Sequence, residues 1–577
     1  MFLEEILAEL KMCSMRKLIT QNSLLLDKRL SLSVGTLLIA IFLLFNNLGE
    51  YALWDDEATT AMFGQTIWNT GDTAAKLGHN LIAYKSGYEL VDLKNRYMPP
   101  LQFYLAAPFV GLNPGSAFAA RFPFALCGIL TIALILYWLY KSEASYTTWL
   151  LTCVGLLCNV SFMLFFRQCR YYAPAIFLST FIVYLYINRD SHKRTYILLS
   201  ICIFFLLCTN YLSYFALLIG LIIDYFVFSR KKHPLTVRQA SLIFFPQLVL
   251  GWLLLSKYTL CFTSNVLQYP VNLWIQDRVN IIFWFFRDIN SCEFGSGLLI
   301  ALAPFLYFQK KNINLIRCPV AILVYIIAIS ILSPKPFYGF GVPTYFYEYN
   351  IAEIRYIAPL IPLCIFITVI TIEALASSKK LFILLLAILA FSTNIFQKAL
   401  LLNAPIYSRW SKYRTLVTSR STIFEYLKEL IFPNKSAYRL TSDWINKNIN
   451  EKDTVWVEPD FACYPLMYHA PKALYAWQLN EKVPKYSELA DIHFFGKIAP
   501  DYIISFGPHD SSAKIKMKEL AAQGVVYKKI DQLNVYWYDL TRPELLWHSF
   551  SNINEISGED EAVYIYKNIN YIGKPRT

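Results

Sequence analysis

The sequence predicts a multi-pass α-helical membrane protein with about eleven transmembrane helices and a C-terminal soluble α/β domain. Three observations lead to this fold class. Of the 577 residues, 56% are hydrophobic and only 16% are charged, whereas about a quarter of the residues in a soluble domain are charged. Long apolar runs separated by basic clusters recur through residues 32–397. Beyond residue 436 these runs give way to short, alternating strand-like and helix-like segments.

The apolar runs are long enough, or nearly so, to cross a bilayer, which takes about 20 apolar residues. The better-defined runs are 32–48, 122–140, 147–166, 171–187, 211–228, 240–256 and 356–375. Shorter runs bounded by charges are 195–209, 318–332 and 381–397, and the weakest run is 297–308. Basic residues fall in every second connection, as the positive-inside rule expects for eleven spans with a cytoplasmic N-terminus. The C-terminal part is then expected on the outer side.

This topology divides the chain into a cytoplasmic segment 1–31, a transmembrane module 32–397, an outer connecting segment 398–435 and an outer α/β domain 436–577. The first outer loop covers 49–121, and its apolar stretch PPLQFYLAAPFVGL is too short to cross, so it is expected along the interface. In the last part, SAYRLTSDWINKNI and SSAKIKMKELAAQG predict helices. TVWVEP, KALYAW and DYIISFG predict strands, and VVYKKIDQLNVYWYDL predicts a strand pair.

The net charge of +13 does not indicate nucleic-acid binding. The basic residues form short clusters between apolar runs, and no basic stripe or base-stacking module accompanies them. The 12 cysteines include no C-x-x-C pair and no zinc-like spacing. The basic clusters are therefore expected to set the orientation of the chain in the membrane, and membrane lipids are expected partners.

The strongest local signal is LWDDEA at residues 53–58, directly after the first span. Three consecutive carboxylates beside hydrocarbon are costly to keep charged without partners. One explanation is helix capping, in which Asp55 or Asp56 caps a helix through EATTAMFGQTIW and Glu57 occupies its first turn. The other is a chemical role for the carboxylates. The sequence leaves both open, and they are compatible.

Two arginine-bearing motifs fall on the same predicted side of the membrane. RQCRYY, at residues 167–172, joins two spans, and EIRYIAP, at residues 353–359, opens a later one. Arginine binds phosphate through two parallel hydrogen bonds. The acidic and basic motifs together therefore predict a site where a phosphate-bearing lipid lies between them. The alternatives are interfacial anchoring and binding of ordinary lipid headgroups or loop carboxylates.

These motifs resemble those of the GT-C glycosyltransferases, a group that includes protein O-mannosyltransferases, lipid A aminoarabinose transferase and lipopolysaccharide-core galacturonosyltransferases. LWDDEA is similar to the L-W-x-D-E-A pattern of the group and leaves Asp55 at the variable position. RYMPPLQFY, ARFPFALCGIL, RQCRYY and IRYIAP resemble further family segments, in order, over residues 33–376. Met98 and Gln168 depart from the pattern, where the family often has a basic and an acidic residue.

The resemblance implies an inverting glycosyltransferase of a bacterial inner membrane, with its C-terminal domain in the periplasm. It would move a sugar from a polyprenyl-phosphate-linked donor to a lipid or glycan acceptor. The implied residues are Asp56 and Glu57 for catalysis, Arg167, Arg170 and Arg355 for the donor phosphate, and Tyr172, Arg96, Lys85 and Tyr356 for substrate contacts. Whether Asp56 and Glu57 also hold a divalent metal, Mg or Mn, stays open.

The chemistry suits these residue types, because a polyprenyl phosphate leaves as a stable anion and needs little protonation. One carboxylate base for the acceptor hydroxyl, with cations at the departing phosphate, would be sufficient. A flippase or transporter is the main alternative, but it is expected to place ionisable residues deep in its spans, whereas Asp224 and Glu373 lie near span ends. Two further alternatives are an O-antigen polymerase or ligase and an inactive scaffold. In the C-terminal domain, His469 is expected to be structural.

Overall fold

The computed structural model describes most of the chain. The described residues are 28–83, 90–189, 192–258, single residues and pairs between 275 and 289, 296–332, 354–376, 380–393, 395–396, 421–433, 436–451, 453–475, 499–535 and 562–570. Lys85 and the segments 1–27, 333–353 and 398–420, on which several sequence predictions fall, lie outside them.

Every one of the eleven predicted apolar runs is helical in the described residues. The long helices are α2 (Lys28–Phe45), α5 (Ala117–Lys141), α10 (Tyr211–Asp224) with the π-helical turn η2 (Tyr225–Ser229), α11 (Val237–Lys257), α14 (Asn314–Leu332), and α15 (Ile361–Ala376) with the 3-10 segment η4 (Ile354–Leu360) before it. The shorter ones are α6 (Tyr146–Cys158), α7 (Val160–Phe166), α8 (Tyr172–Ile187), α9 (Lys193–Leu207), α13 (Gly297–Lys310) and α16 (Lys380–Ser392).

Length and hydropathy identify a multi-pass membrane protein. Six helices of the described residues are long and apolar enough to cross a membrane, and α6 with α7 makes a seventh if this bent pair is one span. The pair bends by 60° at Asn159, which ends α6 and caps α7 by accepting from the amide of Phe162 at 2.9 Å. The prediction of eleven crossings stays a prediction, because the other apolar helices are shorter than a full span.

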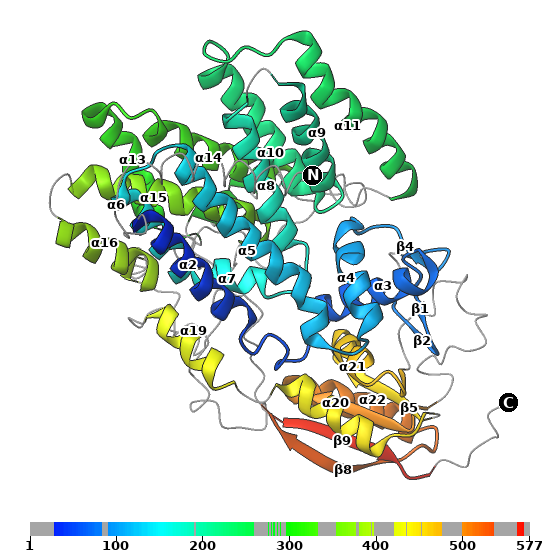
Figure 1. Ribbon diagram of the computed structural model, residues 1–577. Coiled ribbons are helices and arrows are strands. Elements are labelled where there is room, and N and C mark those ends of the chain that lie inside the picture. The colour runs from blue at the N-terminus through cyan, green and yellow to red at the C-terminus, as the bar shows by residue number, and fades with distance from the viewer. Residues whose placement is uncertain are drawn as a thin grey trace.

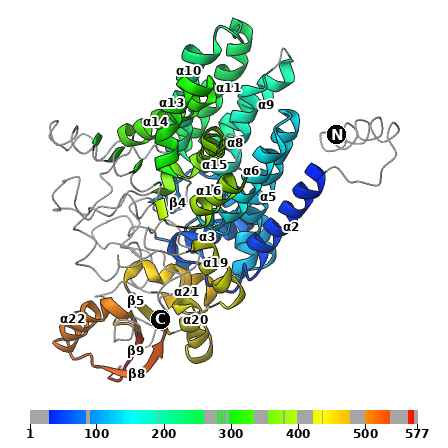
Figure 2. The ribbon, with the colours of Figure 1, turned by 90° about the vertical axis from the view of Figure 1, so that its left-hand side faces the viewer.

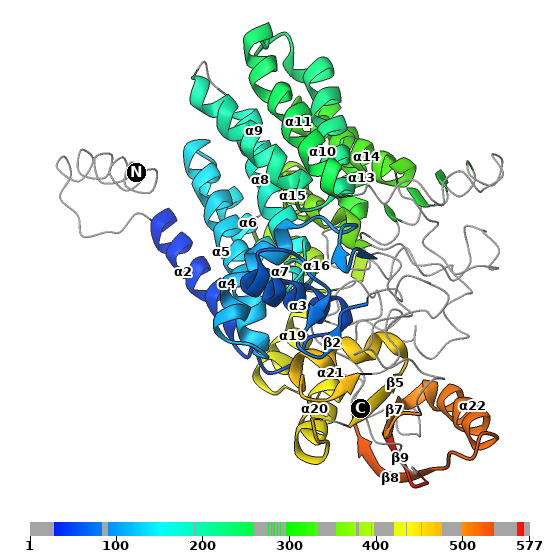
Figure 3. The same cartoon turned by 90° about the vertical axis from the view of Figure 1, so that its right-hand side faces the viewer.

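The long helices run side by side, and the C-terminal part of the chain lies at one end of the bundle (Figures 1, 2 and 3). At that end, the first loop forms α3 (Asp55–Thr70), α4 (Leu101–Leu112) and two short hairpins, β1 (Lys76–Leu77) with β2 (Asn80–Leu81) and β3 (Leu90–Val91) with β4 (Lys94–Asn95). The apolar stretch expected at the interface is α4, and it packs on α3 and α5.

A five-stranded sheet forms the C-terminal part. Its strand order is β6 (Leu474–Tyr475), β5 (Thr454–Glu458), β7 (Tyr502–Phe506), β9 (Ala562–Asn568) and β8 (Tyr527–Asn534). The first three strands are parallel, and β9 and β8 run antiparallel to their neighbours. Helices α20 (Ala437–Asn448) and α22 (Asp510–Ala521) match the sequence prediction. The first part of the predicted strand pair is β8, which pairs with β9, and its second part, residues 536–540, lies outside the described residues.

Short connecting helices join this sheet to the membrane bundle. Helix α19 (Thr422–Ile431) lies beside the end of α2, where the hydroxyl of Tyr426 donates to the carbonyl of Leu43 at 2.7 Å. Helix α21 (Cys463–His469) packs directly on α3. The C-terminal part is therefore in contact with the loop that carries the acidic motif.

Candidate functional site

The acidic motif and the two arginine motifs meet at the start of α3. Asp56 is in the first turn of this helix, and its Oδ2 lies 3.0 Å from Arg170 Nη2 and 3.5 Å from Arg355 Nη1. Arg170 comes from the turn between α7 and α8, and Arg355 from η4. Three segments more than 100 residues apart in sequence thus place one carboxylate between two guanidinium groups.

Neighbouring groups hold Arg170 firmly in this arrangement. Its Nη1 donates to Thr60 Oγ1 at 3.2 Å and, at 3.4 Å, to the backbone carbonyl of Asp56. The guanidinium also lies over the ring of Tyr171, with 5.3 Å to the ring centre. Because Arg170 is buried, its charge is little screened by solvent.

Arg355 is the more accessible of the two arginines, since its side chain is 21% exposed against 8% for Arg170. It lies over the ring of Tyr356 at 5.4 Å. The carbonyl of Tyr356 in turn accepts from the hydroxyl of Tyr325 in α14 at 3.4 Å. The structure therefore connects η4 to the interior of the helix bundle through Tyr325.

Glu57 has a different environment from its neighbour Asp56. It is fully buried, and Arg121 of α5 binds both its oxygens, with Nε to Oε1 at 2.9 Å and Nη2 to Oε2 at 2.6 Å. Oε1 also accepts from the amide of Cys169 at 2.7 Å. Glu57 therefore ties α3 to α5 and to the RQCRYY turn, and we do not retain the prediction that it is catalytic.

Arg121 also fixes the chain between α2 and α3. Its Nη1 donates to the carbonyls of Leu48 and Tyr51 at 3.1 and 2.8 Å, and its Nη2 donates to the carbonyl of Ala52 at 3.1 Å. Arg121 belongs to the motif ARFPFALCGIL, and no role for it was predicted from the sequence. The available signal was an arginine directly before the apolar run 122–140, because a charge beside hydrocarbon needs a partner.

Arg167 does not face the carboxylate of Asp56. It is buried, and its guanidinium donates to the carbonyls of Leu43, Leu44 and Asn46 at 3.1, 3.0 and 2.9 Å, at the C-terminal end of α2. Cations stabilise this end of a helix. The prediction that Arg167 binds the donor phosphate is not carried forward, because these donors already bond to α2.

The capping explanation needs a correction as well. Helix α3 begins at Asp55, and the residue in the cap position is Trp54, whose amide donates to Glu57 Oε2 at 3.4 Å. The side chain of Asp55 accepts from the amide of Asp56 at 2.9 Å. Neither Asp55 nor Asp56 is the cap residue, so capping does not account for Asp56.

The predicted substrate-contact residues have mixed positions. Arg96 forms a two-bond pair with Asp72, at 2.8 and 2.7 Å, and this pair holds the pKa of the Asp72 carboxyl well below its usual range. Tyr172 is fully buried beneath Arg170, with 6.0 Å from the guanidinium to its ring. Tyr356 lies beside Arg355. Arg96 is thus engaged in the loop, whereas the two tyrosines border the site.

The carboxylates at the site do not form a metal centre in the described part of the chain. No group of three or more His, Cys, Asp and Glu side chains there is placed to hold a metal ion. Asp56 and Glu57 each pair with arginine, and a nearby cation opposes binding of a second one. We therefore build no step on the Mg or Mn ion that the sequence left open.

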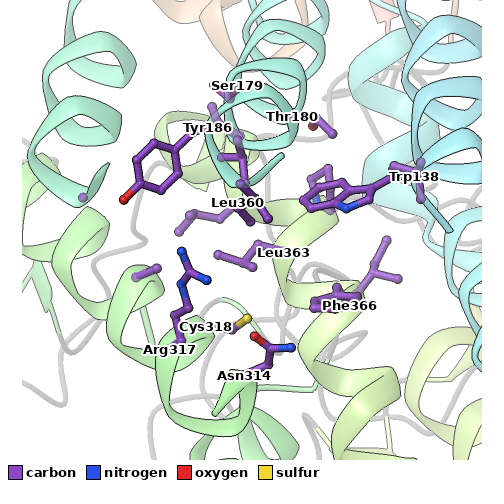
Figure 4. Close-up of a pocket in the computed structure, with 18 of the residues that line it drawn as sticks. Trp138, Ser179, Thr180, Tyr186, Asn314, Arg317, Cys318, Leu360, Leu363 and Phe366 are labelled. Carbon is purple, nitrogen blue, oxygen red and sulfur yellow. The ribbon is translucent and has the colours of Figure 1, made fainter. Parts of the chain in front are cut away.

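An apolar cavity of about 390 Å³ lies within the bundle (Figure 4). Its walls come from α5, α6, α8, α10, α14, η4 and α15. Pro359 and Leu360 of η4 line it, as does Tyr325. At another part of its wall, Arg317 bonds to Asp224 at 2.6 Å. The cavity therefore borders the same short segment that presents Arg355, a feature that sequence reasoning missed.

Comparison with known proteins shows the fold. No protein-family model matches the chain, and no curated protein sequence does. Among solved structures, ArnT from Cupriavidus metallidurans bound to undecaprenyl phosphate is similar, with a TM-score of 0.54, 12% identity, and coverage of 94% of this chain and 99% of that chain. The apo state of the same protein is similar with a TM-score of 0.55 and 11% identity, and the match covers 92% of this chain and 97% of that chain. The chain thus has the GT-C fold of ArnT, as the motifs implied.

Proposed function

We propose that this protein is a membrane glycosyltransferase that transfers a sugar from a polyprenyl-phosphate-linked donor to a hydroxyl of a lipid or glycan acceptor. The observation that carries the proposal is the placement of Asp56 between Arg170 and Arg355. The overall similarity to ArnT supports it, since one ArnT structure contains bound undecaprenyl phosphate. A bacterial inner membrane is the compartment that this similarity favours.

The charges at the site fit the phosphate of such a donor. Arg170, Arg355 and Asp56 together carry one net positive charge, and the phosphodiester that joins a prenyl chain to a sugar carries one negative charge. When the sugar leaves, the phosphate becomes a monoester with greater negative charge. Two arginines stabilise this developing charge more strongly than the starting one, which is the requirement for catalysis.

Asp56 is the proposed base. Its carboxylate is kept charged by the two arginines, and a bound phosphate would compete for them and leave Asp56 oxygens for the acceptor hydroxyl. In the proposed reaction Asp56 accepts the hydroxyl proton, the acceptor oxygen bonds to the anomeric carbon, and the bond from that carbon to the phosphate oxygen breaks with inversion. Glu57 holds the helix that presents Asp56, through its pair with Arg121.

The cavity beside η4 supports a carrier with a long hydrocarbon chain. Its walls are largely apolar, and burial of each methylene contributes about 0.8 kcal/mol. Leu360 and Leu363 line it close to the segment that carries Arg355 (Figure 4). We propose that part of the prenyl chain occupies this cavity while its phosphate reaches the two arginines.

The test uses purified protein and a labelled sugar on polyprenyl phosphate, with transfer to an envelope lipid extract as the measurement. Gly220 lines the cavity and has open space around an added Cβ. We expect Gly220→Trp to lower transfer from long-chain donors at least about tenfold and to spare a short-chain donor, because the indole fills the cavity. Gly35→Trp in α2, also with open space, is the matched control. Equal loss with both donors would contradict this use of the cavity.

The orientation of the chain is a second prediction. If the site faces outward, residues 436–577 lie in the periplasm and the basic connections in the cytoplasm. A phosphatase reporter that works only in the periplasm should be active when fused after Lys574. The same reporter should be inactive when fused after Lys232, because that connection lies in the cytoplasm. An inactive fusion after Lys574 beside an active fusion after Lys232 would show that the orientation is wrong.

A further inference from the structure

The imidazole of His469 connects the C-terminal part of the chain to two loops of the membrane module. His469 ends α21, and its Nε2 lies 3.0 Å from the backbone nitrogen of Leu53. Its Nδ1 lies 3.0 Å from the carbonyl oxygen of Gly115. Both ring nitrogens are thus bonded to backbone atoms of segments more than 350 residues away.

These two partners determine the protonation state of the ring. A backbone amide can only donate, so Nε2 accepts from Leu53 and carries no proton. A carbonyl can only accept, so Nδ1 carries the proton and donates to Gly115. The bonded imidazole is therefore neutral, in a single tautomer. Protonation at Nε2 would set an N–H group against the N–H of Leu53 and break that bond.

The two bonded residues lead directly into the site. Leu53 is three residues before Asp56, the proposed base. Gly115 precedes Ser116, which caps α5 by accepting from the amide of Ala119 at 3.2 Å. Helix α5 carries Arg121, the partner of Glu57. One ring therefore fixes the start of α3 relative to the start of α5.

Other contacts support the same interface. The hydroxyl of Tyr468 donates to the carbonyl of Ser116 at 3.1 Å. Asn80, in the first loop, donates to the carbonyl of Ala473 at 2.9 Å and accepts from the amide of Tyr475 at 2.9 Å. Because buried polar groups of both parts are paired with each other, separation of the two would leave several without partners. The interface has a specific geometry.

We propose that His469 is a positioning residue, through which the C-terminal part of the chain holds the acidic segment in the geometry needed for transfer. The C-terminal part is then a component of the site. Loss of the contact between His469 and Leu53 would release Leu53 and with it the first turn of α3. This proposal rests on the proposed function for its effect on transfer, whereas the contact itself can be tested without activity.

The contact should weaken in acid. Burial and the positive charges of Arg121 in α5 and Arg439 in α20 lower the pKa of His469 to about 3, against an ordinary value of about 6.5. The separated form binds the proton and the bonded form does not. The contact is therefore most stable above about pH 6.5 and loses stability as the pH falls from there toward 3.

The experiment measures hydrogen exchange of residues 53–57 by mass spectrometry, in intact protein in detergent. We expect His469→Ala to raise the exchange rate at Leu53 about tenfold, the effect of one lost hydrogen bond, and His509→Ala to leave it unchanged. His509 lies in the same sheet domain, against Phe461, and has no bond to α3. His469→Gln, whose amide oxygen can accept from Leu53, should restore protection and remove its dependence on pH between 5 and 7.

Transfer assays then separate the two proposals. His469→Ala should lower kcat with little change in donor affinity, because the arginines stay in place. If exchange at Leu53 is the same in wild type and His469→Ala, the positioning role is wrong, whatever the activity. If exchange changes as expected and wild-type protein transfers no sugar from any polyprenyl-phosphate donor, the proposed function fails and the contact stands.

Discussion

Asp56→Asn should abolish most sugar transfer while leaving the donor bound. The substitution keeps the shape of the side chain but removes the proton acceptor, and loss of a general base typically lowers the rate by about 10²–10⁴-fold. Asp56 also competes with the donor phosphate for Arg170 and Arg355. Donor affinity should therefore stay the same or rise, while kcat falls. Single-turnover transfer and equilibrium donor binding on the purified variant measure the two effects.

The neighbouring carboxylates supply matched controls. Asp55→Asn keeps an oxygen that can accept from the amide of Asp56, so it should retain transfer and stability. Glu57→Gln leaves the fully buried Arg121 without its anionic partner, and breaking such a pair costs about 3–5 kcal/mol of stability. The main effect of Glu57→Gln should therefore be a lower melting temperature. An inactive Asp55→Asn beside an active, folded Asp56→Asn would show that the base is assigned one residue too late.

The helices were predictable because apolar runs of this length have few alternatives in a membrane protein. Strand β9 was not, because its partners in the described sheet, β7 and β8, lie at least 28 residues earlier in the chain. Local alternation in residues 562–568 does not say which strand lies beside it. For the same reason the sequence suggested a strand pair within residues 525–540, where the structure pairs β8 with β9.

The site was predicted at the level of motifs, and only in part at the level of residues. The motif pattern predicted that Asp56, Arg170 and Arg355 lie near one another, and in the structure both arginines lie beside Asp56. The sequence did not reveal which arginine meets which carboxylate. Arg167 is three residues before Arg170 in the same motif, yet it bonds to the end of α2. Arg121, just before the apolar run 122–140, binds Glu57. Pairing depends on helix packing, which motif order does not specify.

Arg170→Ala should weaken binding of the phosphate-bearing donor by about 10- to 100-fold. The structure places two donor nitrogens of Arg170 at the site, and a hydrogen bond to a charged group contributes about 1.5–3 kcal/mol. Asp56 keeps Arg355 as a partner at 3.5 Å, so the variant should fold. Arg170→Lys keeps the charge but cannot form two parallel bonds to phosphate, and its affinity should lie between those of wild type and the alanine variant.

The controls isolate the phosphate from the prenyl chain and from net charge. Arg238→Ala removes one positive charge from an exposed residue in the first turn of α11, so it should leave donor affinity unchanged. A polyprenol that lacks the phosphate should bind wild type and Arg170→Ala equally, because the cavity that receives its chain is intact. Equal donor affinity in wild type and Arg170→Ala would remove Arg170 from the phosphate site. Weaker binding of the polyprenol as well would mean that the substitution disturbs the fold, since no charge is then involved.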